Sequence, residues 1–203
     1  AWAKLYRKSF LDSNKIEFGD YRYAEDKIYN YFCYIAGARY AFIDKKIYVY
    51  RRNEQSVSNT YRKDGDKDWM RIAQDLQDKI DSLNYEKKQY SQDEIENYES
   101  IVAWTIYFAA FFDGKMEYEY STGKIRAVIN LLKRYASYDL TKKYLKNPLR
   151  YTKKIPALSY KIMLGGFAFL MKCNMYLLLS LGIKLLVDCH IDERLSDTGR
   201  KED

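Results

Sequence analysis

Apolar residues recur with helical spacing through much of the chain after residue 60. The first stripe is Trp69, Ile72, Ala73, Leu76, Ile80 and Leu83. The second is Ile95, Tyr98, Ile101, Val102, Ile106 and Ala109. Spacings of three and four residues place side chains on one face of an α-helix. The pattern therefore predicts two successive amphipathic helices.

Start signals accompany two of the predicted helices. Ser91 and Glu94 have the spacing of a capping box, in which each side chain bonds the other residue's backbone N–H at a helix start. A further helix is predicted to open at Ser121 or Thr122. Its apolar face carries Ile125, Val128, Ile129, Leu132 and Ala136.

The first sixty residues mix two kinds of pattern. Residues 24–36 have helical periodicity, with Glu25 and Asp26 in the first turn and Gly37 as the stop signal. Residues 40–43 and 47–50 are aromatic and β-branched and flank a short polar turn, which predicts a β-hairpin. The expected fold class is therefore α+β, dominated by helices, with a boundary between residues 1–60 and a helical domain at 61–203.

The last third of the chain has two interpretations. Residues 139–156 are poorly periodic and contain both prolines, as in a connector or a broken helix. The apolar runs at 162–171 and 173–183 are each too short to cross a bilayer, and Lys172 separates them. They are typical either of core helices or of helices lying in a membrane surface, since basic residues precede them.

Charge is unevenly distributed along the 203 residues, whose net charge is +7. Residues 121–187 contain thirteen Lys/Arg and one Asp, or +12, which leaves 7 − 12 = −5 for the rest. Residues 64–99 contain eleven acids and five bases. This acidic region and the lack of an RNA-binding motif disfavour nucleic-acid binding. The three cysteines form no CxxC pair, which disfavours a disulfide or zinc scaffold and fits a reducing cytoplasm.

Three segments in the first sixty residues resemble the catalytic domain of family 2 glycosyltransferases, which have the A-type nucleotide-sugar fold. They are WAKLYRKSFL with IEF (residues 2–11 and 16–18), EDK (25–27) and IYVYRRNEQSVS (47–58). Their order and distances carry the resemblance, which implies that residues 1–60 are the C-terminal, acceptor-side part of that domain. Residues 61–203 are then its helical C-terminal extension.

The resemblance also implies roles for particular residues. Asp26 corresponds to the general base that removes the acceptor hydroxyl proton, and Glu25 to a neighbour that positions the base or binds the acceptor. Arg51 and Ser56 would contact the diphosphate of the donor, and Lys4 would serve the same site. Taken without their surroundings, Glu25 and Asp26 also fit a structural role, because acids in a first turn complement the helix dipole.

The resemblance implies an inverting enzyme of bacterial surface polysaccharide synthesis. It would transfer a sugar from a nucleotide-diphosphate donor to a saccharide or lipid-linked acceptor. The nucleotide-binding half and its Asp-x-Asp motif for Mg²⁺ or Mn²⁺ are expected upstream of residue 2, so the chain reads as an inactive piece of a longer protein. Residues 64–68 also contain the Asp-x-Asp pattern, but they follow the predicted base in the chain and are expected to form a turn and a helix start.

Alternatives stay open at this point. A non-catalytic helical module that docks a partner or a membrane surface accounts equally well for the residues after 59. Such a module, or the enzyme, could also form homo-oligomers. The expected location is cytoplasmic, with the basic helical region held at the inner face of the membrane by anionic lipids.

Overall fold

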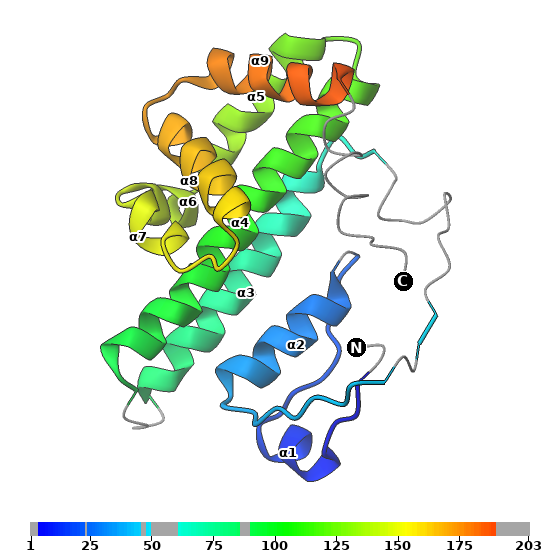
Figure 1. Ribbon diagram of the computed structural model, residues 1–203, viewed down its shortest axis with the longest axis vertical. Coiled ribbons are helices and arrows are strands. Elements are labelled where there is room, and N and C mark those ends of the chain that lie inside the picture. Colours follow the sequence, from blue (N-terminus) through cyan, green and yellow to red (C-terminus); the bar gives the residue numbers. More distant parts are fainter. Residues whose placement is uncertain (1–3, 23, 46–47, 50–60, 86–89, 190–203) are drawn as a thin grey trace. The chain divides into compact units, whose positions relative to one another are not determined.

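The computed structural model describes residues 4–22, 24–45, 48–49, 61–85 and 90–189, with the side chains of 84 and 85 excepted (Figure 1). All regular secondary structure in these ranges is α-helical. The helices are α1 (Lys8–Ser13), α2 (Glu25–Ile35), α3 (Gly65–Tyr85), α4 (Gln92–Tyr120), α5 (Lys124–Ser137), α6 (Asp139–Leu145), α7 (Pro148–Thr152), α8 (Leu158–Lys172) and α9 (Tyr176–Asp188).

The predicted α+β fold class is wrong. Residues 40–45 and 48–49, where the hairpin was expected, form no strand, and the described ranges contain no sheet. Phe42 and Val49 are 94% and 86% exposed, so these two side chains bury little of the apolar surface that would stabilise a strand. A two-stranded hairpin without a third strand or a covering helix is marginal in water, which explains why β-propensity alone misled the prediction.

The chain divides into two compact units, and the division falls within α3 and α4. Unit 1 comprises residues 1–60 and 68–102, and unit 2 comprises residues 61–67 and 103–203. In unit 1, Ile16, Tyr29 and Cys33 form a buried cluster with Phe10, Leu11 and Phe32 packed against it. This cluster joins α1 and the segment that follows it to one face of α2.

Helix α2 ends as its sequence predicts. Gly37 has φ +82°, a conformation that glycine adopts without the steric cost of a Cβ. Its N–H bonds Tyr34 O at 3.0 Å and the Ala38 N–H bonds Cys33 O at 3.0 Å, which is the Schellman arrangement. The predicted helical face is also present, since Ile28 and Ile35 are buried.

In unit 2, α5 packs against α9, and α8 contacts α6, α7 and α9. Residues 139–156 form a broken helix, α6 and α7, with Pro148 at the start of α7, where its missing N–H costs nothing. Two side chains of α4 hold this segment: Tyr107 Oη donates to Tyr144 O at 3.0 Å and Trp104 Nε1 to Tyr151 O at 2.8 Å. Helix α5 begins at Lys124, with Gly123 as its N-cap residue. The sequence had predicted a start at Ser121 or Thr122.

A buried polar network fastens the start of α3 within unit 2. Asp66 is 1% exposed and accepts from Arg134 Nη2 at 3.2 Å and from Tyr138 Oη at 3.0 Å. Tyr135 donates to Asp113 at 2.5 Å, and Tyr61 donates to Glu117 at 2.9 Å. Residues 64–68 are thus a turn and a helix start, as expected.

The capping box predicted at the start of α4 is present. Glu94 N–H donates to Ser91 Oγ at 3.2 Å, while Ser91 N–H and Oγ–H donate to Glu94 Oε2 at 2.8 and 2.7 Å. We expect Ser91→Ala to lower the free energy of unfolding by about 1 kcal/mol in urea titrations. Gln92→Ala, one residue further, is the control; an equal loss there would contradict the assignment.

The same capping box predicts a pH dependence. Bonds from the Ser91 backbone and hydroxyl lower the pKa of Glu94 below its ordinary value. A carboxylate with a lowered folded pKa stabilises the fold above its unfolded pKa, and this contribution is lost as the pH falls through the folded pKa. The stability difference between the native chain and Glu94→Gln should therefore shrink in acid. A difference that is independent of pH would contradict it.

Candidate functional site

The predicted base lies in the first turn of α2. Asp26 is the second residue of the helix, its side chain is partly exposed, and its Oδ1 accepts the Lys27 N–H at 2.8 Å. Ala24, the N-cap residue, makes no side-chain capping bond. Asp26 therefore bonds one of the N–H groups at this helix end, which is the structural role that acids in a first turn commonly have. Glu25 is exposed beside it.

The segment before α1 approaches α2 close to Asp26. Tyr6 Oη donates to Asn30 Oδ1 at 2.9 Å, and Asn30 Nδ2 donates to Asp26 O at 2.6 Å. Burial, followed by the charges of Cys33, Tyr29 and Asp26, raises the pKa of Tyr6 above its usual value. The Tyr6 phenol consequently stays protonated at neutral pH and keeps its role as a donor.

Aromatic rings lie on the same face of α2. Tyr29, one turn after Asp26, stacks on Phe18 with ring centroids 4.1 Å apart, and Tyr6 meets Tyr29 edge to face. Residues three and four apart share a helix face, so Asp26, Tyr29 and Asn30 are neighbours. Phe18 is mostly exposed, so its ring adds an apolar surface to a face that also carries a carboxylate and an amide. Carboxylates, amides and aromatic faces are groups that can bind a sugar.

The other predicted site residues are only partly accounted for. Lys4 is exposed and lies two residues before Tyr6, in the segment that precedes α1. Arg51 and Ser56 lie outside the described residues, so their predicted contact with a diphosphate stays a prediction. No three His, Cys, Asp or Glu side chains of the described ranges gather as metal ligands.

Sequence reasoning missed Tyr6, Phe18 and Asn30 as neighbours of the candidate base. Tyr6 and Asn30 are 24 positions apart, and their hydrogen bond joins two segments of different local structure. The sequence offered one signal for Tyr6 and Phe18, which lie in the segments that resemble the family. It offered none for Asn30.

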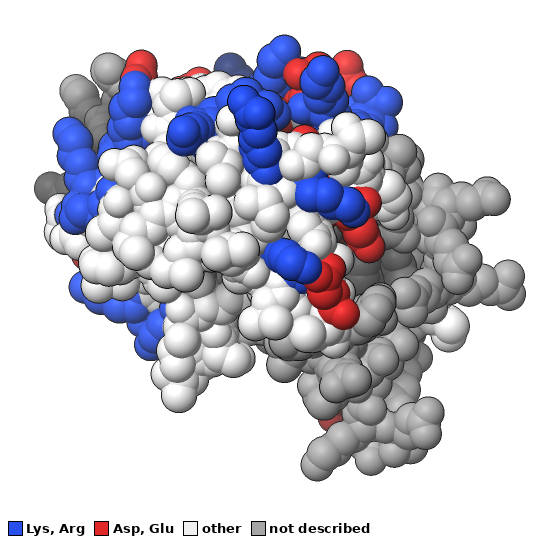
Figure 2. All heavy atoms as spheres, turned by 90° about the horizontal axis from the view of Figure 1, so that it is seen from above, with Lys and Arg blue, Asp and Glu red and all other residues white. Residues whose placement is uncertain are grey.

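A second surface in unit 2 is unusual in its composition. Helices α8 and α9 expose apolar side chains over their whole length, and we call this surface the α8–α9 face. It consists of Leu158, Tyr160, Ile162, Phe169, Met175, Leu177, Leu178, Leu181 and Leu185. Figure 2, which views the structure from the end where Figure 1 places α5 and α9, shows a broad area of uncharged residues partly bordered by Lys and Arg, with Asp or Glu beside some of them.

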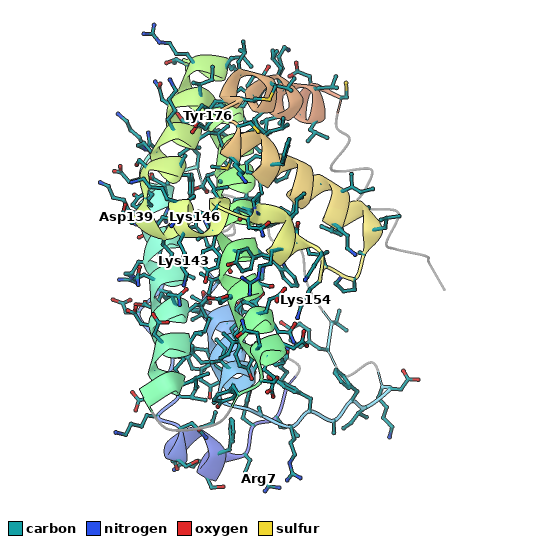
Figure 3. The ribbon with its side chains drawn as sticks, turned by 90° about the vertical axis from the view of Figure 1, so that its left-hand side faces the viewer. Arg7, Asp139, Lys143, Lys146, Lys154 and Tyr176 are labelled. Atoms are coloured by element: carbon teal, nitrogen blue, oxygen red, sulfur yellow. The ribbon has the colours of Figure 1, made fainter. Side chains whose placement is uncertain are left out.

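Basic residues predominate in the sequence around this face, and the acid nearest to it, Asp188 at the end of α9, pairs with Lys184. Residues 140–187 contain nine Lys/Arg and no Asp or Glu. Figure 3 labels three of them, Lys143, Lys146 and Lys154, on the side of unit 2 that carries α6. Lys172, which ends α8, donates to Lys146 O at 2.8 Å, so the end of α8 is held beside the end of α6.

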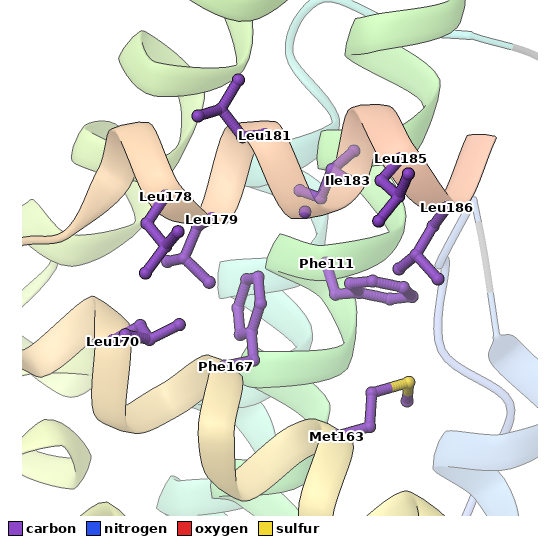
Figure 4. A pocket seen from close by; sticks show the side chains of 11 residues that line it. Phe111, Met163, Phe167, Leu170, Leu178, Leu179, Leu181, Ile183, Leu185 and Leu186 are labelled. Atoms are coloured by element: carbon purple, nitrogen blue, oxygen red, sulfur yellow. The ribbon is translucent and has the colours of Figure 1, made fainter. Parts of the chain in front are cut away.

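An apolar cleft of about 430 Å³ lies between α8 and α9 (Figure 4). Phe111 of α4 and Phe167 of α8 form its floor, and Met163, Leu170, Leu178 and Leu186 are among its walls. Every residue that lines it is apolar, and several of them belong to the α8–α9 face. The cleft therefore offers few hydrogen-bond partners to water and suits an aliphatic occupant.

Two further findings bear on function. Among the described residues, no helix combines the length and apolar character needed to cross a bilayer. Comparison of the chain with protein-family models, curated proteins and solved structures gave no match.

Proposed function

We propose that this chain is the C-terminal part of an inverting, family 2-type glycosyltransferase in which Asp26 is the general base. One observation carries the proposal. Tyr6 and Phe18, from the first segment that resembles the family, pack in unit 1 against the helix that the second segment, residues 25–27, begins: Tyr6 bonds Asn30 and Phe18 stacks on Tyr29, both within about one turn of Asp26. Asp26 stands at the edge of this cluster with its carboxyl partly exposed.

The chemistry follows from the residue types. An alcohol is a poor nucleophile until its proton leaves, so Asp26 would take the proton of the acceptor hydroxyl as it attacks the anomeric carbon of the donor. Glu25 would orient the acceptor or the base. Arg51, Ser56 and Lys4 would stabilise the charge on the departing diphosphate. The Mg²⁺ or Mn²⁺ that such enzymes use would be bound mainly upstream of this chain.

We place the complete enzyme in the cytoplasm, at the inner face of the membrane, where lipid-linked acceptors of surface polysaccharides are found. The net charge of residues 121–187 favours this location, since anionic lipids attract basic segments. The alternative function, a helical docking module without catalysis, is favoured by the exposed apolar residues of the α8–α9 face. Docking through the α8–α9 face is by itself compatible with catalysis in one chain.

The stereochemistry of the product tests the proposed reaction. A single displacement with one base inverts the anomeric carbon, so proton NMR of the product formed by the complete protein should show the configuration opposite to that of the donor. A retained configuration would contradict the role given to Asp26. Failure to transfer from any nucleoside-diphosphate sugar, with the protein folded, would leave the docking module as the better account.

A further inference from the structure

Helices α8 and α9 each present an exposed stripe without a charged residue. The stripe on α8 and the residue after it consists of the exposed positions Leu158, Ile162, Gly166, Phe169 and Cys173, at spacings of four, four, three and four. On α9 they include Leu177, Leu181 and Leu185, at spacings of four. The water-facing stripes of ordinary helices carry Lys, Glu or Asp. The composition of these two stripes therefore indicates that they contact an apolar surface.

The charges beside the stripes indicate which apolar surface that is. Nine Lys/Arg and no acid occur in residues 140–187, and a bilayer with anionic headgroups offers phosphate oxygens and an apolar interior together. A second copy of the chain would instead bring two sets of lysines together at the same interface, at a cost in like-charge repulsion. Charge complementarity therefore selects the membrane over self-association.

The lysines on the two helices also fit an arrangement in which the helices lie in the membrane surface. Lys161 and Lys172 lie on α8, and Lys184 on α9, and long basic side chains can bury their stems in an apolar layer while the ammonium groups reach the headgroups. Lys184 also pairs with Asp188, where α9 ends, so that acid is already neutralised. The open cleft between the two helices gives acyl chains a place to enter.

We propose that α8 and α9 lie in the plane of an anionic membrane surface, with the α8–α9 face immersed at the headgroup–acyl boundary and the lysines of residues 142–184 on the headgroups. The proposal rests on the location given above for the enzyme but not on the role of Asp26. Vesicle binding and sugar transfer are separate measurements, so failure of either idea is distinguishable from failure of the other.

Vesicle sedimentation tests the charge requirement. The 203-residue chain should bind vesicles of phosphatidylcholine with about 30% phosphatidylglycerol at least about tenfold more tightly than vesicles of phosphatidylcholine alone. Raising the salt from about 0.1 M to about 0.5 M should weaken the binding severalfold, because screening shortens the reach of the lysines. Indifference to lipid charge, or no binding to either vesicle, would overturn the proposal.

Single substitutions test the face. Ile162→Gln, Leu177→Gln and Leu185→Gln change side chains that are 66%, 58% and 60% exposed, so the fold should persist. Each should lower vesicle binding about tenfold. Phe42→Gln, at a residue 94% exposed in unit 1, is the matched control and should bind as the native chain does. Variants that bind vesicles normally but change the oligomeric state by light scattering would identify a self-association surface and reject the membrane.

A fluorescent label reports the immersion itself. Cys173 is exposed between α8 and α9, whereas Cys33 is buried, so in a Cys189→Ser chain an environment-sensitive dye attaches at residue 173. Anionic vesicles should shift its emission to the blue and protect it from aqueous iodide. A chain that sediments with the vesicles while its dye stays open to iodide would show that another surface binds, and would overturn the assignment. Asp26→Asn should leave this signal unchanged.

Discussion

Replacement of Asp26 by asparagine in the complete enzyme is expected to lower the turnover of sugar transfer by at least about 100-fold, or about 2.7 kcal/mol of activation free energy. Asparagine is similar in shape and can still accept the Lys27 N–H, now 2.8 Å from Asp26 Oδ1, but it cannot take a proton. The loss should appear in kcat, with little change in the KM of the nucleotide sugar, since the donor is bound elsewhere.

Two matched variants separate catalysis from folding in this experiment. Asp12→Asn removes the same charge from an exposed position of α1 and should transfer sugar at the native rate. Asp26→Glu keeps a carboxylate and should recover part of the activity. The melting temperature of Asp26→Asn should stay within a few degrees of that of the native protein. Near-native turnover of Asp26→Asn would reject Asp26 as the base.

Asp66→Ala is expected to lower the free energy of unfolding by about 3 kcal/mol. The carboxylate is 1% exposed and accepts bonds from Arg134 and Tyr138, and its removal leaves the guanidinium without its buried partner. Burial, together with the bond to Asp66, raises the pKa of Tyr138 to about 12, so the tyrosine stays a donor throughout the neutral range. The figure lies at the low end of the range for buried pairs because the Arg134 side chain is 44% exposed.

Urea unfolding followed by circular dichroism measures this effect. Asp64→Ala is the control: this acid lies two positions earlier and forms an exposed pair with Lys67, 3.5 Å away, so its loss should cost less than about 1 kcal/mol. Tyr138→Phe should cost about 1 kcal/mol, since it removes one bond of the network. Equal effects of Asp64→Ala and Asp66→Ala would mean that both acids act only through the charge of the helix start.

The helices of this protein could be predicted from the spacing of apolar residues. The stripe from Trp69 to Leu83 lies in α3, and the capping box of Ser91 and Glu94 opens α4 as expected. The pattern underestimated α4, which continues to Tyr120 over 29 residues, beyond the predicted stripe ending at Ala109. The position of an amphipathic helix can be predicted from local periodicity alone, which is why this part of the prediction succeeded.

The predicted hairpin failed because a strand depends on partners that local sequence does not specify. Residues 40–43 have β-propensity, but Phe42 and Ile43 remain exposed and no strand forms among the described residues. In the candidate site, too, local features could be predicted and long-range contacts could not. Glu25 and Asp26 were placed correctly in the first turn of a helix, whereas the approach of Tyr6 to Asn30 depends on long-range packing.

The sequence by itself determined where most helices lie, how α2 and α4 are capped, and that the basic residues gather in the last third of the chain. These properties depend on side-chain spacing within a few turns and on composition. Only the tertiary structure decided which apolar faces are buried. It placed Ile183 of α9 against Gly114 of α4, where an added Cβ would lie 2.8 Å from Ile183 Cδ1, and left Leu177, Leu181 and Leu185 exposed. Burial of a helix face requires a complementary partner, and contacts between residues distant in the sequence determine that partner.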